Sequence, residues 1–376
     1  MRVAIFCHSI VSDWNHGNAH FLRGVVRELL ARGHRVRIFE PRDGWSRTSL
    51  VTQQGLAPLQ EFRKTFPDLR STLYDLETLD VAAAVDGANL VLVHEWNDPD
   101  LVARLGRLRR GGAFRLLFHD THHRSATQPE EMARYDLRDY DGVLAYGEVI
   151  RQLYLQRGWA ARAWTWHEAA DTTIFRPQEG ERRAGDIVWI GNWGDGERTR
   201  QLDEFLLRPA AELEASGSIF GVRYPASARR AIARTGLAYR GWVANHRVPL
   251  IFAQHRATVH VPRRPYVESL PGIPTIRPFE ALAGGIPLVS APWDDWEGLF
   301  RAGDDYLLVR NGREMTKALR DVLHDPELAA HLVRHGRRTI LARHTCAHRV
   351  DELLAVCAEL GLETVPLSAR RAAATS

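Results

Sequence analysis

Apolar residues recur in two different patterns along the first forty residues of the chain. The segments from Arg2 to His8 and from Arg35 to Glu40 are short apolar runs, which predict buried strands. From Ala19 to Arg32 the apolar residues instead repeat every three or four positions, as on one face of a helix that Gly33 can close. This strand–helix–strand order predicts a parallel sheet.

The same alternation continues to about Asn311, after which the chain is expected to be helical to about Leu360; over residues 42–80 we expect irregular structure. Further strands are predicted over residues 88–94, 114–119, 142–146, 163–166, 187–190, 219–222, 237–239, 257–261, 286–289 and 306–309. We therefore predict an α/β fold with two Rossmann-like domains facing across a cleft. The predicted parts are a first domain (1–170), a linker (171–185), a second domain (186–345), a C-terminal helix that crosses back to the first domain (346–365) and a disordered tail (366–376).

Composition narrows the class of protein. Of the 376 residues, 45% are hydrophobic and 26% charged, which is typical of a globular domain, and no apolar run is long enough to span a membrane. The N-terminus does not resemble a signal peptide, so we expect a cytoplasmic protein. Cys7, Cys346 and Cys357 lack metal-ligand spacing and are expected to be free thiols. A net charge of +4 without a recognition motif argues against a nucleic-acid partner.

One predicted helix, from Asp98 to Arg110, carries a basic face. Its arginines are Arg104, Arg107, Arg109 and Arg110. This face is either a solvated surface or a site of weak peripheral membrane contact.

Polar residues gather just after the predicted strands of the first domain. His8, His94 and the pair His119-Asp120 each follow an apolar run, and in an open parallel sheet the ligand crevice lies at those carboxyl ends. The loop after the first strand contains Gly17 as its one glycine and lacks G-x-G-x-x-G, which argues against a dinucleotide cofactor. A ligand could still approach the backbone at Gly17-Asn18.

The segment His119-Asp120-Thr121-His122-His123 admits three interpretations. It could be a zinc site, although no matching ligand pair occurs elsewhere in the sequence. It could be a sugar-binding and acid/base loop at a strand end, or a hydrogen-bonded loop with no direct role.

The glycine-rich segment from Gly191 to Arg198 follows a strand and precedes a helix. Its glycines, among them Gly194, would let the backbone approach a diphosphate, and Arg198 could neutralise that group. The segment lacks the Gly-Lys-Ser/Thr ending of a P-loop, so a nucleoside triphosphatase is not expected. The alternative is a tight turn without a ligand.

The segment GIPTIRPFEALAGGIPLVSAPW, from Gly272 to Trp293, predicts a turn, a short helix and a buried strand. Thr275 is a plausible N-cap, and the pair Gly284-Gly285 can end the helix. The helix start offers unpaired amides and a positive dipole end to a phosphate. Glu280, one turn into the helix, could bind both hydroxyls of a ribose, or could be a surface residue favoured by the dipole.

Taken together, the two halves resemble a known family. The chain is similar to GT-B glycosyltransferases of the large retaining group often called family 4, and more closely to the branch named after spore maturation protein CgeB. The resemblance is strongest in IRPFEALAGGIPLVSAPW, which is similar to the family's donor motif. It extends to the linker DTTIFRP, to the segment GWVANHRVPLIFAQHRATVHVPR before the donor motif, and to HTCAHRVDELL at the C-terminal helix.

The resemblance implies a role for individual residues. Glu280 matches the ribose-binding second glutamate of the family's E-x7-E motif, whereas the first glutamate, which contacts the donor sugar, falls on Gly272. Asn192 stands where the family has a second basic residue, which Arg263, Arg264 or Arg277 could replace. The predicted catalytic residues are His119, Asp120 and Arg198. The predicted donor-binding residues are Gly17, Asn18, His94, Gly191, Asn192, Gly194, Arg263, Pro274, Thr275, Ile276, Arg277 and Glu280.

We therefore predict a glycosyltransferase that uses a UDP- or GDP-linked sugar as its substrate, with retention and without a metal or other cofactor. The acceptor could be a sugar, a lipid-linked sugar, a small molecule or a protein. Two alternatives are a non-hydrolysing nucleotide-sugar epimerase, which shares the fold, and a nucleotide-sugar-binding protein that has lost catalysis.

Overall fold

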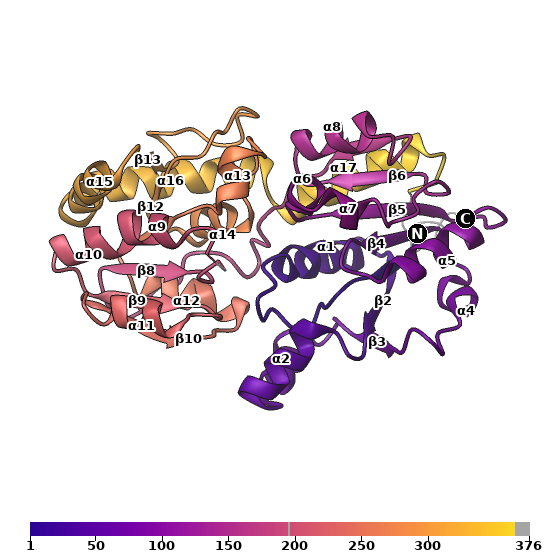
Figure 1. Ribbon diagram of the computed structural model, residues 1–376, viewed down its shortest axis with the longest axis horizontal. Coiled ribbons are helices and arrows are strands. Elements are labelled where there is room, and N and C mark those ends of the chain that lie inside the picture. The colour runs from indigo at the N-terminus through magenta and orange to yellow at the C-terminus, as the bar shows by residue number, and fades with distance from the viewer. Residues whose placement is uncertain (195, 365–376) are drawn as a thin grey trace, which may run out of the picture. The chain divides into compact units, whose positions relative to one another are not determined.

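The computed structural model describes residues 1–194 and 196–364. These residues form two compact units, which are described separately (Figure 1). Unit 1 comprises Met1–His167 and the helix that begins at Cys346, and unit 2 comprises Glu168–Thr345. Asp195 in the glycine-rich segment and the predicted tail over 366–376 lie outside the described residues.

Unit 1 is built on a seven-stranded sheet in the order β3-β2-β1-β4-β5-β6-β7. Its strands are β1 (Arg2–Phe6), β2 (Arg35–Pro41), β3 (Ser71–Tyr74), β4 (Leu90–His94), β5 (Arg115–Asp120), β6 (Gly142–Ala145) and β7 (Ala163–Thr165). All neighbouring strands are parallel, and β1 pairs with both β2 and β4, so the strand order reverses between β1 and β4.

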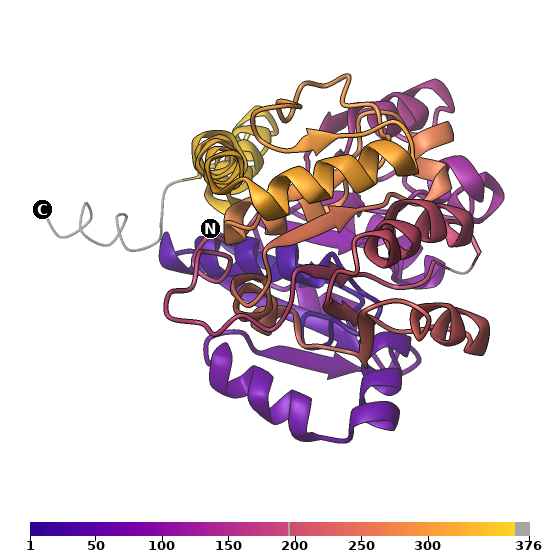
Figure 2. The same cartoon turned by 90° about the vertical axis from the view of Figure 1, so that its left-hand side faces the viewer.

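Helices flank the strands on both sides in each unit (Figures 1 and 2). Those of unit 1 are α1 (Ala19–Ala31), α2 (Trp45–Gln54), α3 (Ala57–Thr65), α4 (Val81–Val85), α5 (Pro99–Arg109), α6 (Arg124–Thr127), α7 (Pro129–Met132), α8 (Glu148–Gln156) and α17 (Cys346–Glu359).

The C-terminal helix α17 returns to unit 1, as predicted. It packs against α1, where Arg32 forms an ion pair with Asp351 and donates to the carbonyl of Ala347 at 3.1 Å. The indole Nε1 of Trp166, a fully buried side chain, donates to the carbonyl of Arg349 at 2.7 Å. Unit 1 is therefore assembled from two distant parts of the sequence.

Unit 2 contains a six-stranded parallel sheet in the order β10-β9-β8-β11-β12-β13. Its strands are β8 (Ile187–Ile190), β9 (Gly217–Phe220), β10 (Leu237–Gly241), β11 (Ala257–His260), β12 (Leu288–Ser290) and β13 (Leu307–Leu308). Its helices are α9 (Thr199–Leu202), the π-helical turn η1 (Asp203–Leu207), α10 (Arg208–Glu212), α11 (Ala226–Ile232), the 3₁₀ turn η2 (Asn245–Arg247), α12 (Val248–Ala253), α13 (Arg264–Glu268), α14 (Ile276–Gly284), α15 (Gly312–His324) and α16 (Pro326–Arg343).

The position of β8 inside the sheet, between β9 and β11, explains why its sequence is apolar throughout. Ile187 and Trp189 pack into the core on one face of the sheet, whereas Val188 and Ile190 pack into the core on the other face. Both faces are covered by helices, so no position on the strand is left for a polar side chain.

The predicted helix and strand near residue 280 are confirmed. Gly285 has φ 74° and ψ 38°, a left-handed conformation, and its amide bonds back to Ala281 and Leu282. The strand β12 follows and pairs in parallel with β11 and β13.

The prediction of irregular structure over residues 42–80 is wrong, because this segment forms α2, α3 and β3. Helix α2 buries only Ser46 and Leu50, and α3 buries only Leu59 and Phe62. With so few apolar positions per turn, neither helix produces a repeat that could be recognised in the sequence.

The basic face predicted on α5 is mostly neutralised. Arg109 and Arg110 form ion pairs with Asp141 and Asp139, and Arg104 donates to two carbonyls of the loop between β3 and α4. Within residues 1–194 and 196–364, no helix is long and apolar enough to cross a membrane. The three cysteines are buried and free, as predicted.

Candidate active site

The predicted site residues lie at the carboxyl ends of the strands in both sheets. In unit 1 the strand order reverses between β1 and β4, and in unit 2 it reverses between β8 and β11. At such a point the two connections leave toward opposite faces of the sheet, which opens space for a ligand. The two groups of residues are described in turn.

Arg198 joins the ends of β8 and β11 in unit 2. Its guanidinium donates to the carbonyls of Val261 at 2.9 Å and Asn192 at 2.5 Å, and it lies 5.1 Å from the ring centroid of Trp189. Its Nε is buried without a hydrogen-bond partner. Among the described residues, no carboxylate forms an ion pair with this guanidinium. A cation held by neutral carbonyls retains its charge and can attract an anion.

The glycines of this segment make room for Arg198. A Cβ atom at Gly194, where φ is +89°, would lie 2.9 Å from Nε of Arg198. A Cβ atom at Gly191 would lie 2.6 Å from the ring of Trp189. The glycine-rich sequence, interpreted above as a backbone cradle for phosphate, therefore also makes room for a partly buried arginine.

Two further arginines accompany Arg198. Arg263 pairs with Glu197 at 3.1 Å, and Arg277 pairs with Glu280. Burial first, and the charge of Arg263 second, lower the pKa of Arg198 to about 9. The three cations thus carry more positive charge than their two carboxylates compensate.

His260, at the end of β11, lies close to this cluster. Its Nδ1 lies 2.9 Å from Oγ of Ser290, and its Nε2 is buried without a hydrogen-bond partner. Burial first, then the positive charges of Arg198 and Arg277, lower the pKa of His260 to about 3. The ring is therefore neutral and keeps one nitrogen available for a ligand hydrogen bond. His260 was not predicted as a site residue, because the sequence does not show that one of its ring nitrogens lacks a hydrogen-bond partner.

The start of α14 contains a strained residue. Thr275 stands at the predicted N-cap, but its φ of 59° and ψ of −177° lie in a region that only glycine adopts readily, and its side chain makes no cap bond. Pro274 and Ile276 beside it are buried. A β-branched residue in this conformation costs about 1–3 kcal/mol, and such strain is concentrated at functional sites.

Glu280 is fully buried and fully engaged. Its carboxylate accepts from Asn245 Nδ2 at 2.6 Å and from Arg277. The interpretation of Glu280 as a surface residue stabilised only by the dipole is therefore wrong. Asn245, in η2, was not selected from the sequence, because it is 35 residues from Glu280 and the resemblance assigns no role to it.

The position that lacks the family's first glutamate is occupied by other side chains. Gly272 has φ +89°, and a Cβ atom there would lie 2.4 Å from Nε1 of Trp296 and 2.9 Å from Oε1 of Glu297. Nε1 of Trp296 donates to the carbonyl of Pro271 at 2.8 Å, which fixes the indole in this place. A carboxylate is thus present beside residue 272, although residue 272 cannot carry one.

In unit 1, His94 connects the first loop to the end of β5. Its Nε2 lies 3.1 Å from Oδ1 of Asn18 and 2.9 Å from Oγ1 of Thr121. Asn18 precedes α1 without capping it through its side chain. Gly17, its neighbour, is exposed.

Four buried histidine rings follow one another at the ends of β1, β4 and β5. The ring centroids are 5.5 Å apart for His8 and His16, 5.9 Å for His16 and His94, and 5.4 Å for His94 and His119. Burial lowers the pKa of all four, to about 4 for His8 and about 3 for His119. The row is therefore neutral at physiological pH.

Two buried carboxyl groups lie next to this row. Both oxygens of Glu95 and Oδ2 of Asp120 have no hydrogen-bond partner, and Arg124 Nη2 approaches Glu95 Oε2 only to 3.9 Å. Burial, and then the neighbouring charge of Asp120, raise the pKa of Glu95 well above its ordinary value. Such a pair can hold a proton at neutral pH, as general acid/base groups do.

The rest of the histidine-rich loop is structural. Nδ1 of His123 lies 2.8 Å from Oγ1 of Thr127, one turn into α6, and the amide of His122 donates to Asp120 at 3.1 Å. Among the described residues, the set whose ligand atoms are close enough together for a metal is elsewhere, at Asp304, His331 and His335. The zinc interpretation of this loop therefore gains no support from the structure.

Comparison with known proteins agrees with this description. Residues 198–355 match a protein family described as glycosyl transferase-like. No curated protein sequence matches the chain. Many solved structures share the fold of both units at low sequence identity.

Three of these structures illustrate the similarity. Sucrose-phosphate synthase from Thermosynechococcus elongatus has a TM-score of 0.64 at 15% identity, over 96% of this chain and 99% of that one. HepE from Anabaena, solved with UDP and glucose, has a TM-score of 0.65 at 13% identity, over 96% and 100%. An α-glucosyltransferase solved with UDP and a 13-mer DNA has a TM-score of 0.69 at 10% identity, over 95% and 99%. The fold is that of GT-B glycosyltransferases, and the match to the glycosyl transferase-like family covers residues 198–355.

The strain at Thr275 can be tested directly. Replacing Thr275 by glycine should raise the free energy of unfolding by about 1–3 kcal/mol, because glycine adopts φ 59° and ψ −177° without penalty. Replacing it by alanine keeps Cβ and should leave most of the strain. Equal melting temperatures for the Gly and Ala variants would contradict this account.

The raised pKa of Glu95 gives a pH-dependent prediction. Between the ordinary glutamate pKa and its raised value, folded Glu95 keeps a proton that the unfolded chain releases, so its contribution to stability falls as pH rises. The Glu95→Gln variant should lose less stability than the wild type between pH 5 and pH 8. At pH 8, each 1 kcal/mol by which Glu95→Gln is more stable than the wild type would raise its melting temperature by about 2–4 °C. The exposed Glu130→Gln is the control, and an identical pH profile for the two variants would refute the prediction.

Proposed function

We propose that this GT-B glycosyltransferase moves a sugar from a nucleotide diphosphate to an acceptor, and that unit 2 binds the nucleotide while unit 1 binds the acceptor. The observation that carries the proposal is the guanidinium of Arg198, fixed at the ends of β8 and β11 by carbonyls and lacking an ion-pair partner among the described residues. Arg263 and Arg277 add charge beside it. This arrangement suits a diphosphate better than any neutral ligand.

The start of α14 would receive the same diphosphate. The amides near Thr275, Ile276 and Arg277 lie at the positive end of the helix dipole. The strained backbone of Thr275 would then be the cost of directing those amides toward the anion.

Glu280 would bind the ribose hydroxyls. Its carboxylate now accepts from Asn245 and Arg277, and the two hydroxyls of a ribose would take over one or both of these bonds. Arg277 would thereby be released to the diphosphate. UDP is the first nucleotide to test, since similar structures were solved with UDP.

Glu297 would contact the donor sugar. Its carboxylate lies beside Gly272, where the resemblance places the sugar-binding glutamate of the family. Trp296 would hold the neighbouring wall of the sugar pocket through its bond to Pro271.

Cleavage of the donor builds negative charge on the leaving diphosphate, and Arg198 with its neighbours would stabilise that charge. We expect retention by front-side displacement, as the resemblance to the retaining group implies. Three arginines can supply the positive charge that other enzymes obtain from a metal ion, so we expect activity to survive a chelator. In unit 1, His119 would contact the donor sugar and Asp120 would accept the proton of the acceptor hydroxyl.

The central experiment is calorimetry with UDP. The Arg198→Gln variant should bind UDP about 10- to 100-fold more weakly, because hydrogen bonds to charged groups contribute about 1.5–3 kcal/mol. Turnover should fall about a hundredfold, the usual loss when one donor to the developing charge is removed. The exposed Arg200, two residues away on α9, provides the control Arg200→Gln. Unchanged UDP binding by folded Arg198→Gln would overturn the proposal.

A second experiment separates the roles of the two carboxylates. Glu280→Gln should weaken the binding of UDP and of a UDP-sugar by the same factor, because both ligands contain the ribose. Glu297→Gln should leave UDP binding unchanged and weaken only the UDP-sugar, by about tenfold or more. Loss of UDP affinity in Glu297→Gln would show that this residue does not act on the sugar.

Incubation with a panel of UDP-sugars distinguishes the remaining alternatives. A transferase should release free sugar slowly in the absence of an acceptor. An epimerase would exchange a stereocentre of the sugar, and a binding protein would bind the nucleotide sugar without turnover.

A further inference from the structure

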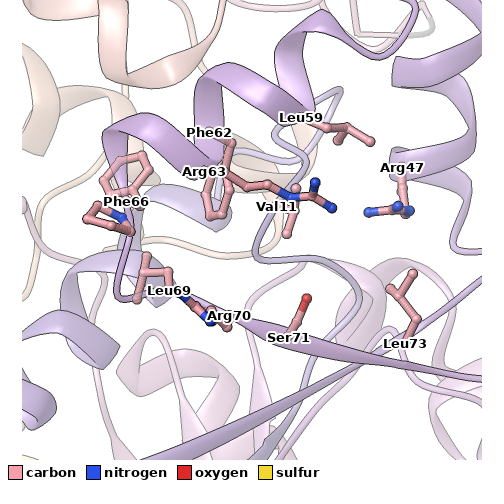
Figure 3. A pocket seen from close by; sticks show the side chains of 11 residues that line it. Val11, Arg47, Leu59, Phe62, Arg63, Phe66, Leu69, Arg70, Ser71 and Leu73 are labelled. Carbon is pink, nitrogen blue, oxygen red and sulfur yellow. The ribbon is translucent and has the colours of Figure 1, made fainter.

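Unit 1 contains a cavity that the proposed catalytic residues do not use. Its volume is about 430 Å³, and it is lined by α2, α3, β3 and the loop after β1 (Figure 3). This volume lies in the usual range for small-molecule sites, roughly 300–1,000 Å³.

Three arginines line the cavity, one from each neighbouring element. Arg47 comes from α2, Arg63 from α3, and Arg70 from the residue before β3. Figure 3 shows the side chains of Arg47 and Arg63 pointing toward each other across the cavity. Within the described part of the chain, none of the three forms an ion pair or a hydrogen bond. By contrast, Arg42 and Arg109 in the same unit both pair with aspartates.

The remaining wall is apolar. Leu59, Phe62, Phe66 and Leu69 line it and are each 5% exposed or less. The guanidinium of Arg23 lies 4.9 Å from the ring centroid of Phe62 and 5.5 Å from that of Phe66. Nη1 of Arg23 lies 2.9 Å from Oδ2 of Asp13, and this ion pair holds the guanidinium in place against the two rings. The aromatic wall is therefore supported before any ligand binds.

The buried carboxylate nearest to the cavity is already satisfied. Glu40 accepts from the amides of Ile10 and Val11 and from the hydroxyl of Ser9, and it also bonds to Ser71, which lines the cavity. Burial raises the pKa of Glu40, and its oxygens are satisfied by its own hydrogen-bond donors, so the three arginines remain available for a ligand anion.

The cavity is connected to the histidine row. Ser46, which precedes Arg47, donates its amide to Nε2 of His8 at 3.2 Å. Val11, in the cavity wall, belongs to the loop that leads to Asn18 and His94. A ligand in the cavity would thus touch the same loop that contributes to the ends of β1 and β4.

We propose that this cavity binds the acceptor, and that the acceptor is an amphipathic anion with a phosphate or carboxylate head and an apolar body. Arg47 and Arg63 hold the head, because a guanidinium pairs with such groups through two parallel hydrogen bonds. The apolar body packs on Phe62 and Phe66. This inference rests on the proposed function for the role of the ligand, but not for its binding.

In the transfer, the acceptor hydroxyl oxygen forms a bond to the anomeric carbon of the donor sugar. The bond from that carbon to the diphosphate oxygen breaks, UDP leaves, and the hydroxyl proton passes to Asp120. No oxidant, reductant or further reactant is needed.

The test is calorimetry of the full chain with octyl phosphate below its micelle concentration. Octyl phosphate should bind at least tenfold more tightly than inorganic phosphate, which lacks the apolar body, and than octyl glucoside, which lacks the charge. Arg47→Gln and Arg63→Gln should each weaken its binding at least tenfold. Arg107→Gln, at an exposed arginine of α5, makes the same charge change elsewhere in unit 1 and should bind like the wild type.

Three results would overturn the proposal. One is that octyl phosphate and octyl glucoside bind with equal affinity. Another is that Arg107→Gln weakens octyl phosphate binding as much as Arg47→Gln and Arg63→Gln do, which would indicate an effect of net charge alone. The third is that a short DNA duplex binds more tightly than octyl phosphate and depends on the same arginines, which would assign the cavity to nucleic acid.

The acceptor role is tested with 8-hydroxyoctyl phosphate and a panel of UDP-sugars. The wild type should form a glycosylated product, detected by mass spectrometry, and Arg63→Gln should lose it while binding UDP normally. If octyl phosphate binds through the arginines but the wild type does not bind UDP, the proposed function fails and the cavity remains a binding site. If UDP binds normally and octyl phosphate does not, only the inference about the cavity fails.

Discussion

The structure of unit 2 depends on a positive charge that is partly withdrawn from solvent without a negative partner among the described residues. Removing a guanidinium from water is costly unless hydrogen bonds or an opposite charge replace the lost hydration. Arg198 receives only partial compensation, from two carbonyls and the face of Trp189. Neighbouring features follow from this charge. Gly194 and Gly191 make space for it, and His260 stays neutral partly because of it. A bound anion would complete the compensation, which explains why such an unfavourable arrangement is kept.

The two units are electrostatically different at the ends of their strands. Unit 2 presents a cluster of arginines, whereas unit 1 presents neutral histidines and a carboxyl pair that can hold a proton. A diphosphate requires the first environment and a hydroxyl group about to lose its proton requires the second. The proposed division of labour between nucleotide and acceptor therefore rests on desolvation and charge in each unit taken separately.

Much of the fold could be predicted from the sequence, because buried strands and amphipathic helices leave a clear periodic pattern. The pattern failed over α2 and α3, where few apolar residues are buried in each turn, and the arginine-lined cavity was missed with them. The helix that begins after Thr275 was predicted correctly, but the strain at Thr275 is a backbone property that the residue type does not show. The closeness of Glu297 to Gly272 was not predicted for another reason. Glu297 and Gly272 are 25 positions apart in the sequence. They come together through the conformation of the loop, which a local sequence pattern does not show.

The return of α17 to unit 1 has a consequence for how the protein is made. Trp166 and α1 obtain their partner helix only after all of unit 2 has left the ribosome. Unit 2 is continuous in sequence and can complete its core during synthesis, while α1 and Trp166 still lack the helix that packs on them. The order of maturation thus runs against the order of the sequence, and the last helix to emerge is the one that completes the first domain to be translated.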